Sequence, residues 1–306
     1  MGRKVGFGQY RLENGRGGFI KWGLWGILIL VMVVGWLKLA VGSSWGDDRY
    51  YLMVVVEEKM LRVAGVNAKE GRLVELIIPD NMMIPVVGMS GSLKAGSLWQ
   101  FAEGEGRAVG IVQSSLERWL GVKINGVIRS KSLNRVGWKE VLLTTDRQIL
   151  IDKIRWFRVL NKLRDDQKSR MVVPDEMLER KRYPDGEEVL IVDESRFGDW
   201  VGKLWNNAGL TNEEVKIKVI NATGEEGIGR LAERMIRGAG GLVVKVESGE
   251  RQVGGCWFVA EGAENQKETK DWLTKQMDCE VRKEGDKVSM GEMELWLGED
   301  WAKIYR

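Results

Sequence analysis

The sequence of 306 residues contains no histidine and only two cysteines. Without histidine, the chain has no imidazole to act as a general base, a proton carrier or a metal ligand, which excludes Ser-His-Asp and Cys-His catalytic machinery. Two cysteines, Cys256 and Cys279, cannot build a four-ligand zinc site of the Cys/His type within one chain. They could form one disulfide in an oxidising compartment, but we expect two small, buried apolar side chains instead.

Neither sign of charge dominates the sequence. The 47 basic and 44 acidic residues give a formal net charge of +3, and apolar residues make up 44% of the chain. Such a near balance gives no general reason to expect nucleic-acid binding. The length is sufficient for a membrane segment and about two compact domains.

A long uncharged run lies near the N-terminus. It reads WGLWGILILVMVVGWL from Trp22 to Leu37, with Lys21 and Lys38 at its ends, where their ammonium groups can extend outward to water. This is about the length that crosses roughly 30 Å of hydrocarbon, and tryptophans near both ends are typical of membrane spans. We predict a transmembrane helix over residues 19–42, with the lipid bilayer as its partner.

The charges that flank this run predict its orientation. Residues 1–18 form a basic tail, whereas Asp47 and Asp48 follow the span. By the positive-inside rule, the tail is cytoplasmic and the rest of the chain is extracytoplasmic, as in a single-pass membrane protein. The alternative is a signal peptide cleaved after the small residues 40–42. We prefer the anchor, because the apolar core is longer than a typical signal core and Lys38 interrupts the approach to that site.

Residues 47–205 read as a first extracytoplasmic α/β region. Apolar runs predict strands over Tyr50–Val56 and Arg72–Pro79, paired as a hairpin or as neighbours. Apolar residues at helical spacing then predict a helix that ends at Gly121, followed by a strand over residues 122–128.

The remainder of this region reads as one helix and two loops. Residues 146–164 predict a basic amphipathic helix, which could touch anionic lipid or a phosphate polymer, although we expect it to pack on the core with a solvated basic face. Residues 89–97 and 179–188 predict loops. In the first loop, Ser90 and Lys94 are four residues apart and not three, which argues against a serine-lysine catalytic pair.

Residues 212–306 predict a second α/β domain with two helix-containing crossovers. The expected strands cover residues 215–220, 242–246 and 256–260, with further strands near 279–283 and 292–298, and the expected helices cover residues 228–237 and 264–277. The predicted fold class is therefore α/β: one N-terminal transmembrane helix followed by two extracytoplasmic α/β domains.

The turn between the first strand and helix of this domain is rich in glycine, which raises the question of a phosphate site. Its glycines do not follow G-x-G-x-x-G, no P-loop lysine follows, and Glu225 and Glu226 occupy the place where a phosphate would lie. We expect Thr223 to cap the helix and Gly238 to Gly241 to end it.

Two segments of this domain carry a family resemblance. The stretch VINATGEEGIGRLAERMI, from Val219 to Ile236, resembles the C-terminal module of LytR-CpsA-Psr envelope proteins, although Ala222 replaces the usual glycine. The ending GEMELWLGEDW, from Gly291 to Trp301, is similar to the closing strand of that module. The resemblance implies a structural turn made by Asn221, Thr223, Gly224 and Gly227.

The first region resembles the catalytic domain of the same family in degenerate form. VELIIPDN is similar to a family strand that ends in Ile-Pro-Arg-Asp, but the arginine between Pro79 and Asp80 is missing. The family's arginine-rich stretch has no clear counterpart. Active members transfer a phosphate-linked glycopolymer from a polyprenyl pyrophosphate carrier to peptidoglycan, which requires arginines and usually a carboxylate-bound magnesium ion.

The resemblance leads to two functional hypotheses. The first is a non-catalytic relative without a cofactor, which binds peptidoglycan, a glycopolymer, a lipid-linked precursor or another envelope protein. The alternative is a divergent phosphotransferase, whose phosphate ligands would be Arg107, Arg129, Arg135 and Arg147. Asp80 would hold magnesium in that alternative, although a turn aspartate explains it equally well.

Overall fold

The computed structural model describes residue 25 and residues 43–46, 49–58, 60–130, 150–184, 186–250, 253–260, 266–282 and 292–306. The chain divides into two compact units, Met1–Gly42 and Ser43–Arg306, and the account below concerns the second unit. Apart from Trp25, the membrane span predicted at residues 19–42 lies outside the described residues. Across the ranges that are described, no helix combines the length and apolar character needed to cross a membrane.

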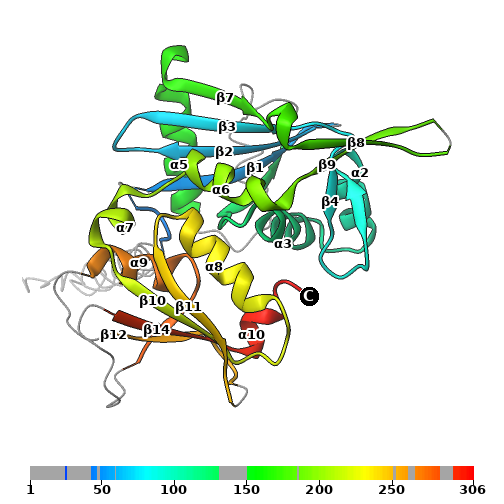
Figure 1. The fold of residues 1–306 in the computed structure, drawn as a ribbon. Coiled ribbons are helices and arrows are strands. Elements are labelled where there is room, and N and C mark those ends of the chain that lie inside the picture. Colours follow the sequence, from blue (N-terminus) through cyan, green and yellow to red (C-terminus); the bar gives the residue numbers. More distant parts are fainter. Residues whose placement is uncertain are drawn as a thin grey trace, which may run out of the picture. The chain divides into compact units, whose positions relative to one another are not determined.

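The first sheet contains five strands in the order β6-β1-β2-β3-β7, of which Figure 1 labels β1, β2, β3 and β7. Their bounds are β1 (Tyr50–Val56), β2 (Leu61–Asn67), β3 (Arg72–Ile78), β6 (Gly126–Arg129) and β7 (Lys168–Val172). Strands β1, β2 and β3 are antiparallel in succession, whereas β6 is parallel to β1 and β7 is parallel to β3. Both predicted strands are confirmed as β1 and β3, but their predicted pairing was wrong, because β2 lies between them.

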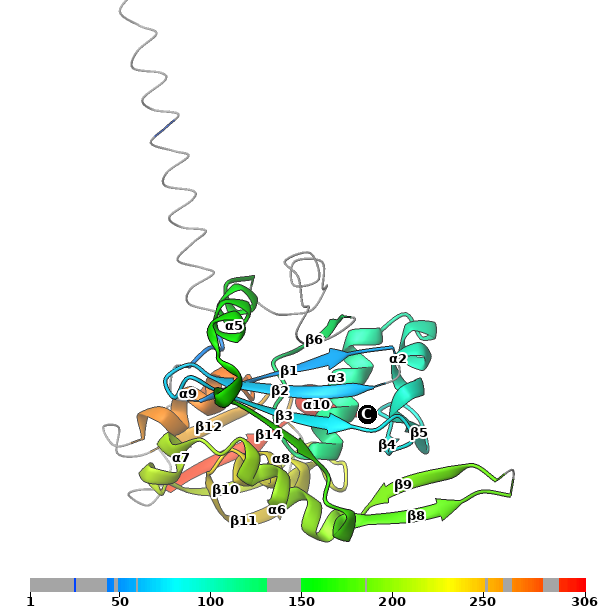
Figure 2. The same cartoon turned by 90° about the horizontal axis from the view of Figure 1, so that it is seen from above.

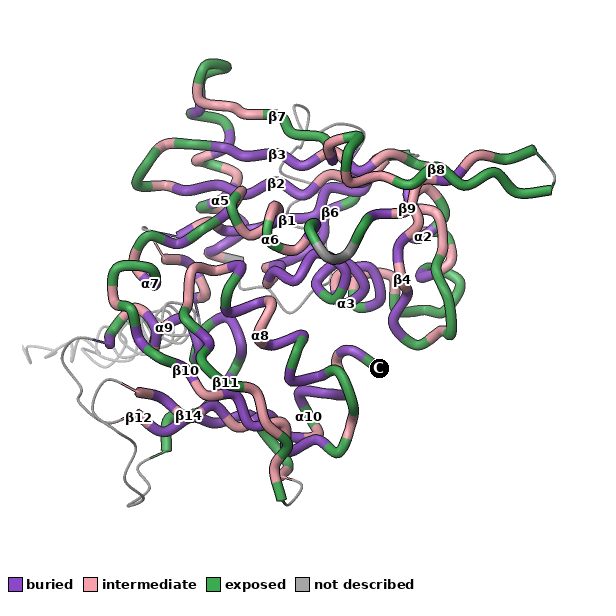
Figure 3. The backbone as a smooth tube through the Cα atoms, viewed as in Figure 1, coloured by how far each residue is buried: buried purple, intermediate pink, exposed green. Residues whose placement is uncertain are grey.

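Helices cover both faces of the first sheet. On one face, Leu52 and Val54 share a core with residues of α2 (Ala95–Gly104), α3 (Ala108–Leu120) and α6 (Glu194–Leu204). On the other face, Met53 and Val55 pack with Trp156 of α5 (Leu150–Lys162). Because successive side chains of a strand point to opposite faces, β1 is buried along almost its whole length (Figure 3). The apolar run YYLMVVV therefore reflects a strand with two buried faces.

Two small hairpins accompany the first sheet. Strands β4 (Met83–Pro85) and β5 (Ser92–Lys94) form one, and β8 (Leu178–Arg182) and β9 (Glu188–Val192) form the other, which extends outward in Figure 2. Short 3₁₀ helices, η2 (Asp165–Gln167) and η3 (Asp175–Met177), flank β7. Both loop predictions were therefore wrong in part: residues 89–97 include β5 and the start of α2, and residues 179–188 include most of the second hairpin.

The second sheet has five strands in the order β11-β10-β14-β12-β13. Their bounds are β10 (Lys216–Asn221), β11 (Leu242–Ser248), β12 (Trp257–Ala260), β13 (Glu280–Val281) and β14 (Glu292–Leu297). Strand β10 is parallel to both of its neighbours, and β12 is antiparallel to β14. Helices of this region are α7 (Ala208–Glu213), α8 (Ile228–Gly238), α9 (Lys267–Lys275) and α10 (Glu299–Ala302). The order of the predicted strands and helices is confirmed, whereas α7 and α10 were not predicted.

One face of the second sheet packs on the core of this region. Met293, Leu295 and Leu297 of β14 are fully buried with residues of α8 and α9, whereas the alternate residues of that strand are half-buried. On the opposite face, Lys218 contacts Glu294 at 3.1 Å and also pairs with Glu247, and Trp257 stacks on Trp296 with ring centres 4.9 Å apart. This alternation is typical of a sheet with one covered face.

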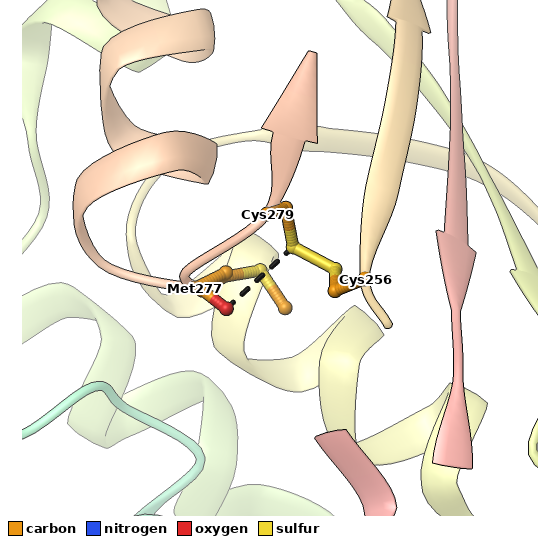
Figure 4. The surroundings of a disulfide bond; sticks show 3 residues. All are labelled: Cys256, Met277 and Cys279. Carbon is orange, nitrogen blue, oxygen red and sulfur yellow. Dashed lines mark hydrogen bonds between the residues drawn. A yellow bond between two sulfur atoms is a disulfide. The ribbon is translucent and has the colours of Figure 1, made fainter. Parts of the chain in front are cut away.

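The two cysteines form a disulfide (Figure 4). Cys256 directly precedes β12 and Cys279 directly precedes β13, and their Cα atoms are 4.6 Å apart. The prediction of two separate apolar side chains was therefore wrong. Both residues are buried, which agrees with their apolar character, but the parallel pairing of β12 with β13 places them side by side.

Three glycines bring helices of the two regions into backbone contact. A Cβ atom on Gly202 of α6 would lie 3.0 Å from the Cα atom of Gly238, at the end of α8. A Cβ atom on Gly238 would lie 3.0 Å from the carbonyl oxygen of Gly121, which ends α3 with φ of 67° as predicted. We call Gly121, Gly202 and Gly238 the glycine junction. The close approach means that a side chain at Gly238 would require the Gly121 backbone to shift.

Candidate functional site

The predicted phosphate ligands are only partly described. Arg135 and Arg147 lie outside the described residues. Arg129 ends β6 with an exposed side chain, which pairs with Glu103 of α2 at 3.3 Å and lies 5.6 Å from the ring centre of Trp99. Arg107 is exposed at the start of α3.

Asp80 lies far from Arg129 within the first sheet. Strands β3 and β6 run in the same direction, so Arg129, the last residue of β6, and Asp80, two residues after β3, lie at the same edge of the sheet. Because β1 and β2 lie between them, and neighbouring strands are about 4.8 Å apart, their backbones are separated by roughly 14 Å. Asp80 is exposed. No group of three or more His, Cys, Asp or Glu residues suitable for a metal ion occurs in the described ranges.

A charged cluster on the first sheet was not predicted from the sequence. Arg62 of β2 pairs with Glu57 at 3.0 Å and with Glu75 of β3, while Arg170 of β7 contacts Glu75 at 3.3 Å. Glu75 is 2% exposed. Burial acts to lower the pKa of Arg62, but hydrogen bonding and charge from Glu75, with a smaller effect of Glu57, raise this pKa overall. Both arginines therefore have carboxylate partners, which oppose the binding of a phosphate.

The glycine-rich turn after β10 is held by its own side chains. The Asn221 side chain donates to the carbonyl of Glu225 at 2.7 Å and accepts from the Thr223 hydroxyl at 2.6 Å. Thr223 in turn accepts from the Glu225 amide at 3.0 Å. Gly224 and Gly227 have φ of 76° and 86°, a region that favours glycine. Gly227, and not Thr223, precedes the first residue of α8, so the predicted cap by Thr223 was wrong.

The expected stop of α8 is confirmed. The helix ends at Gly238, and Gly240 follows with φ of 97°. Gly229, within the first turn of α8, lies close to β11, because a Cβ atom there would be 2.8 Å from Val246. The glycines of this stretch thus serve turn geometry and helix packing.

A groove of about 430 Å³ lies beside this turn. Its walls come from the end of α3, the turn, α8 and the last residues of the chain; they include Arg118, Trp119, Glu226, Leu231, Arg234 and Arg306. The Arg234 guanidinium donates to the Arg118 carbonyl at 2.8 Å, and that of Arg118 donates to the Tyr305 carbonyl at 3.2 Å. Arg306 pairs with Glu225. The groove therefore presents both positively charged hydrogen-bond donors and negatively charged acceptors. Such a surface suits a polar ligand that carries hydroxyl, amide and charged groups.

A buried polar network underlies this groove. Glu117 of α3 is fully buried and accepts hydrogen bonds from the Tyr305 hydroxyl at 2.7 Å, the Lys123 ammonium at 3.0 Å and the Ile124 amide at 3.0 Å. Burial raises the pKa of Tyr305 well above its ordinary value, and the charge of Glu117 raises it further. The network ties the end of the chain to α3. Sequence reasoning missed it because Glu117 and Tyr305 are 188 residues apart.

Among known proteins, no family model and no curated protein matches the chain. Solved structures do match. The crystal structure of B. subtilis TagT is 12% identical and covers 52% of this chain and 91% of its own, with a TM-score of 0.37. The crystal structure of B. subtilis TagV is 10% identical and covers 51% of this chain and 96% of its own, with a TM-score of 0.36. The LytR-CPS2A-psr family protein YwtF (TagT) with bound octaprenyl pyrophosphate lipid is 11% identical. It covers 52% of this chain and 91% of its own, with a TM-score of 0.36.

These structural neighbours are LytR-CpsA-Psr proteins. Because the TM-scores stay below 0.5, the function of this chain has to be argued from its own residues.

Proposed function

We propose that the protein is a membrane-anchored, extracytoplasmic cell-envelope protein that binds a wall polymer without turnover. In this proposal the basic tail is cytoplasmic, residues 19–42 span the bilayer once, and the later regions are extracytoplasmic. The ligand is peptidoglycan or an attached glycopolymer, with a lipid-linked precursor or another envelope protein as further partners. No cofactor is required. The sequence resemblance to LytR-CpsA-Psr envelope proteins supports this assignment.

The disulfide supports the extracytoplasmic location. Disulfides persist in oxidising compartments and are rare where thiols are kept reduced. Cys256 and Cys279 close their link inside the core of the second sheet, where both side chains are buried. A structural disulfide of this kind agrees with the orientation that the flanking charges of residues 19–42 predict.

The proposal of binding without turnover rests on one observation. Among the described residues near the predicted catalytic site, the charged side chains pair with each other and do not point to one common phosphate position. Arg62 and Arg170 contact Glu75, Arg129 contacts Glu103, and Asp80 is separated from Arg129 by two strands. Phosphoryl transfer depends on positive groups placed together around one phosphate and its metal ion. The groove beside the glycine turn offers a polar binding surface instead.

A divergent phosphotransferase remains the second candidate. Arg129 contacts α2 through Glu103, four residues before Arg107 in the sequence. In this candidate, Arg129 would have to leave Glu103 to bind a phosphate together with Arg107, Arg135 and Arg147, and Asp80 would hold magnesium.

Ligand binding by the full-length chain separates the two candidates. Purified protein is tested for sedimentation with peptidoglycan, and for binding and consumption of a polyprenyl-pyrophosphate-linked glycopolymer, with and without magnesium. We expect sedimentation that does not depend on magnesium, and no consumption of the lipid-linked substrate. Magnesium-dependent transfer that Arg129→Ala abolishes would establish the phosphotransferase. Binding to neither ligand would leave a protein partner as the proposed function.

The groove is tested with a matched pair of variants. Arg234→Gln removes a charge that lines it, whereas Arg164→Gln removes an exposed arginine that pairs with Asp166 at 3.1 Å away from the groove. We expect peptidoglycan binding to weaken at least fivefold in Arg234→Gln only. Equal binding by both variants would exclude the groove as the contact surface.

A further inference from the structure

A small crevice of about 30 Å³ lies where β1 approaches α7, α8 and α9. Its walls include Leu52, Asn207, Met235, Gly238 and Trp272. Two charged side chains also line it, Arg49 and Lys123, and both are cationic. No carboxylate is found among the described residues that form its walls.

Arg49 places two unpaired donors at this crevice. The residue is only 6% exposed, and its Nη2 atom contacts Glu268 at 3.4 Å and Asp271 at 4.0 Å, both outside the crevice walls. Its Nε and Nη1 atoms are buried and have no hydrogen-bond partner. Buried polar groups are almost always satisfied in folded proteins, so these two N–H groups call for an acceptor.

Asn207 supplies a third unpaired donor. Its Oδ1 atom accepts from the Gly209 amide at 2.9 Å, which assigns the other side-chain atom as the nitrogen. That Nδ2 atom is buried without a partner, in a residue that is 3% exposed. The crevice therefore gathers three donors from two buried side chains.

Two neighbouring polar side chains of the crevice already have other partners. The carbonyl oxygen of the Gln276 side chain already accepts from Asn125 at 2.9 Å. The Lys123 ammonium donates to Glu117 and to the Tyr305 hydroxyl, each at 3.0 Å. Both cations have carboxylate partners outside the crevice, so the three unpaired donors of Arg49 and Asn207 are the groups that call for an anion.

We propose that this crevice binds a small monatomic anion, with chloride as the natural ligand. The space open to the centre of a water-sized sphere is about 30 Å³, which exceeds the roughly 10–15 Å³ that one water molecule needs by the same measure. A halide ion, which is a single atom of about water size, fits this space. Because the walls come from both sheet regions, the bound anion joins them and stabilises the folded chain.

Thermal unfolding of the full-length chain tests the proposal. The melting temperature is measured in increasing sodium chloride, with sodium gluconate keeping the ionic strength constant so that general screening does not change. We expect a saturable rise of a few degrees with chloride. A crystal grown in bromide should show an anomalous peak within hydrogen-bond distance of Arg49 and Asn207.

Asn207→Asp provides the sharpest variant. It keeps the acceptor for the Gly209 amide and replaces the unpaired Nδ2 donor by a carboxylate oxygen, which carries the negative charge that the anion would supply. In gluconate, we expect the melting temperature of this variant to equal or exceed that of the original chain. We also expect the variant's melting temperature not to rise with chloride. Asn161→Asp, at an exposed position of α5, is the matched control and should keep the response.

Arg49→Lys is a second variant, which keeps the charge near Glu268 but removes the two unpaired donors. We expect its half-saturating chloride concentration to rise at least threefold. Equal melting temperatures in chloride and gluconate, together with no bromide peak, would show that water alone fills the crevice and would overturn the proposal. A chloride response that persists unchanged in Asn207→Asp would place the anion elsewhere.

Discussion

The two sheets of this protein reach stability by different means. The first sheet is covered by helices on both faces, and its central strands are buried along nearly their full length. The second sheet has one covered face and an opposite face on which charged and aromatic side chains pair. It also carries the disulfide. A sheet without a second helical layer buries less apolar surface, so a covalent link and contacts with its neighbour contribute more to its stability.

The largest expected effect on the free energy of unfolding comes from the contact between the two sheet regions. Glu117→Gln removes the carboxylate that binds Lys123 and Tyr305 in a buried site. Breaking a buried ion pair on one side leaves the other charge without its partner, so we expect the free energy of unfolding to fall by about 3 kcal/mol. Urea unfolding followed by tryptophan fluorescence measures it. A loss below about 0.5 kcal/mol would mean that the network does not join the regions.

Loss of the disulfide should affect the second region most. In the double variant Cys256→Ala with Cys279→Ala, we expect a loss of about 2–4 kcal/mol, because the link restricts the unfolded chain. Hydrogen exchange locates the change: amides of β12 and β13 should lose protection more than those of β1 and β2. Uniform loss of protection would instead show that the two sheets unfold as one unit.

A third prediction concerns the glycine junction. Gly238→Ala places a methyl group 3.0 Å from the Gly121 carbonyl, so the backbones must separate, and we expect a loss of about 1–3 kcal/mol. Gly110→Ala in α3 is the matched control. No atom lies within 4 Å of a Cβ atom there, so the better helix propensity of alanine should stabilise that variant by about 0.5–1 kcal/mol. Equal effects of both substitutions would contradict the close approach at Gly238.

The smallest effect is a difference in pH dependence. The folded-state pKa of Tyr305 is raised by burial and by Glu117, so its contribution to stability is complete below its unfolded pKa, about 10. That contribution declines as the pH rises above this value, because the unfolded state then releases the proton more readily. Tyr305→Phe should therefore unfold at lower urea near neutral pH but lose less stability between about pH 10 and 11. Parallel pH curves for the two proteins would contradict this assignment.

Local patterns predicted the second region better than the first. The strand, glycine turn, helix and strand from residue 215 to 246 follow in the expected order. The spacing of apolar residues that distinguishes a strand from a helix is visible there within a short stretch of sequence. In the first region, LRVAGVN was missed as strand β2, because Arg62 and Gly65 interrupt its apolar character. Without β2, the order of the sheet could not be predicted.

The candidate site depended on contacts that sequence patterns do not contain. Pairing of Arg62 with Glu75 requires the register of β2 against β3, and the link of Cys256 to Cys279 requires β12 beside β13. The missing arginine between Pro79 and Asp80 was readable directly. The residue types thus indicated which catalytic groups are missing. The partners of the charged residues that are present could be identified only from the folded structure.

The glycine junction also bears on how such a protein can change over time. Gly121, Gly202 and Gly238 belong to three helix segments, and a Cβ atom on Gly202 or on Gly238 would press on the backbone of another glycine of the junction. A replacement of the second region by a homologous module would succeed only if the incoming helix also lacked a side chain at that point. The two regions are therefore not freely exchangeable parts, and a chimera would need its contact residues transferred together with the module.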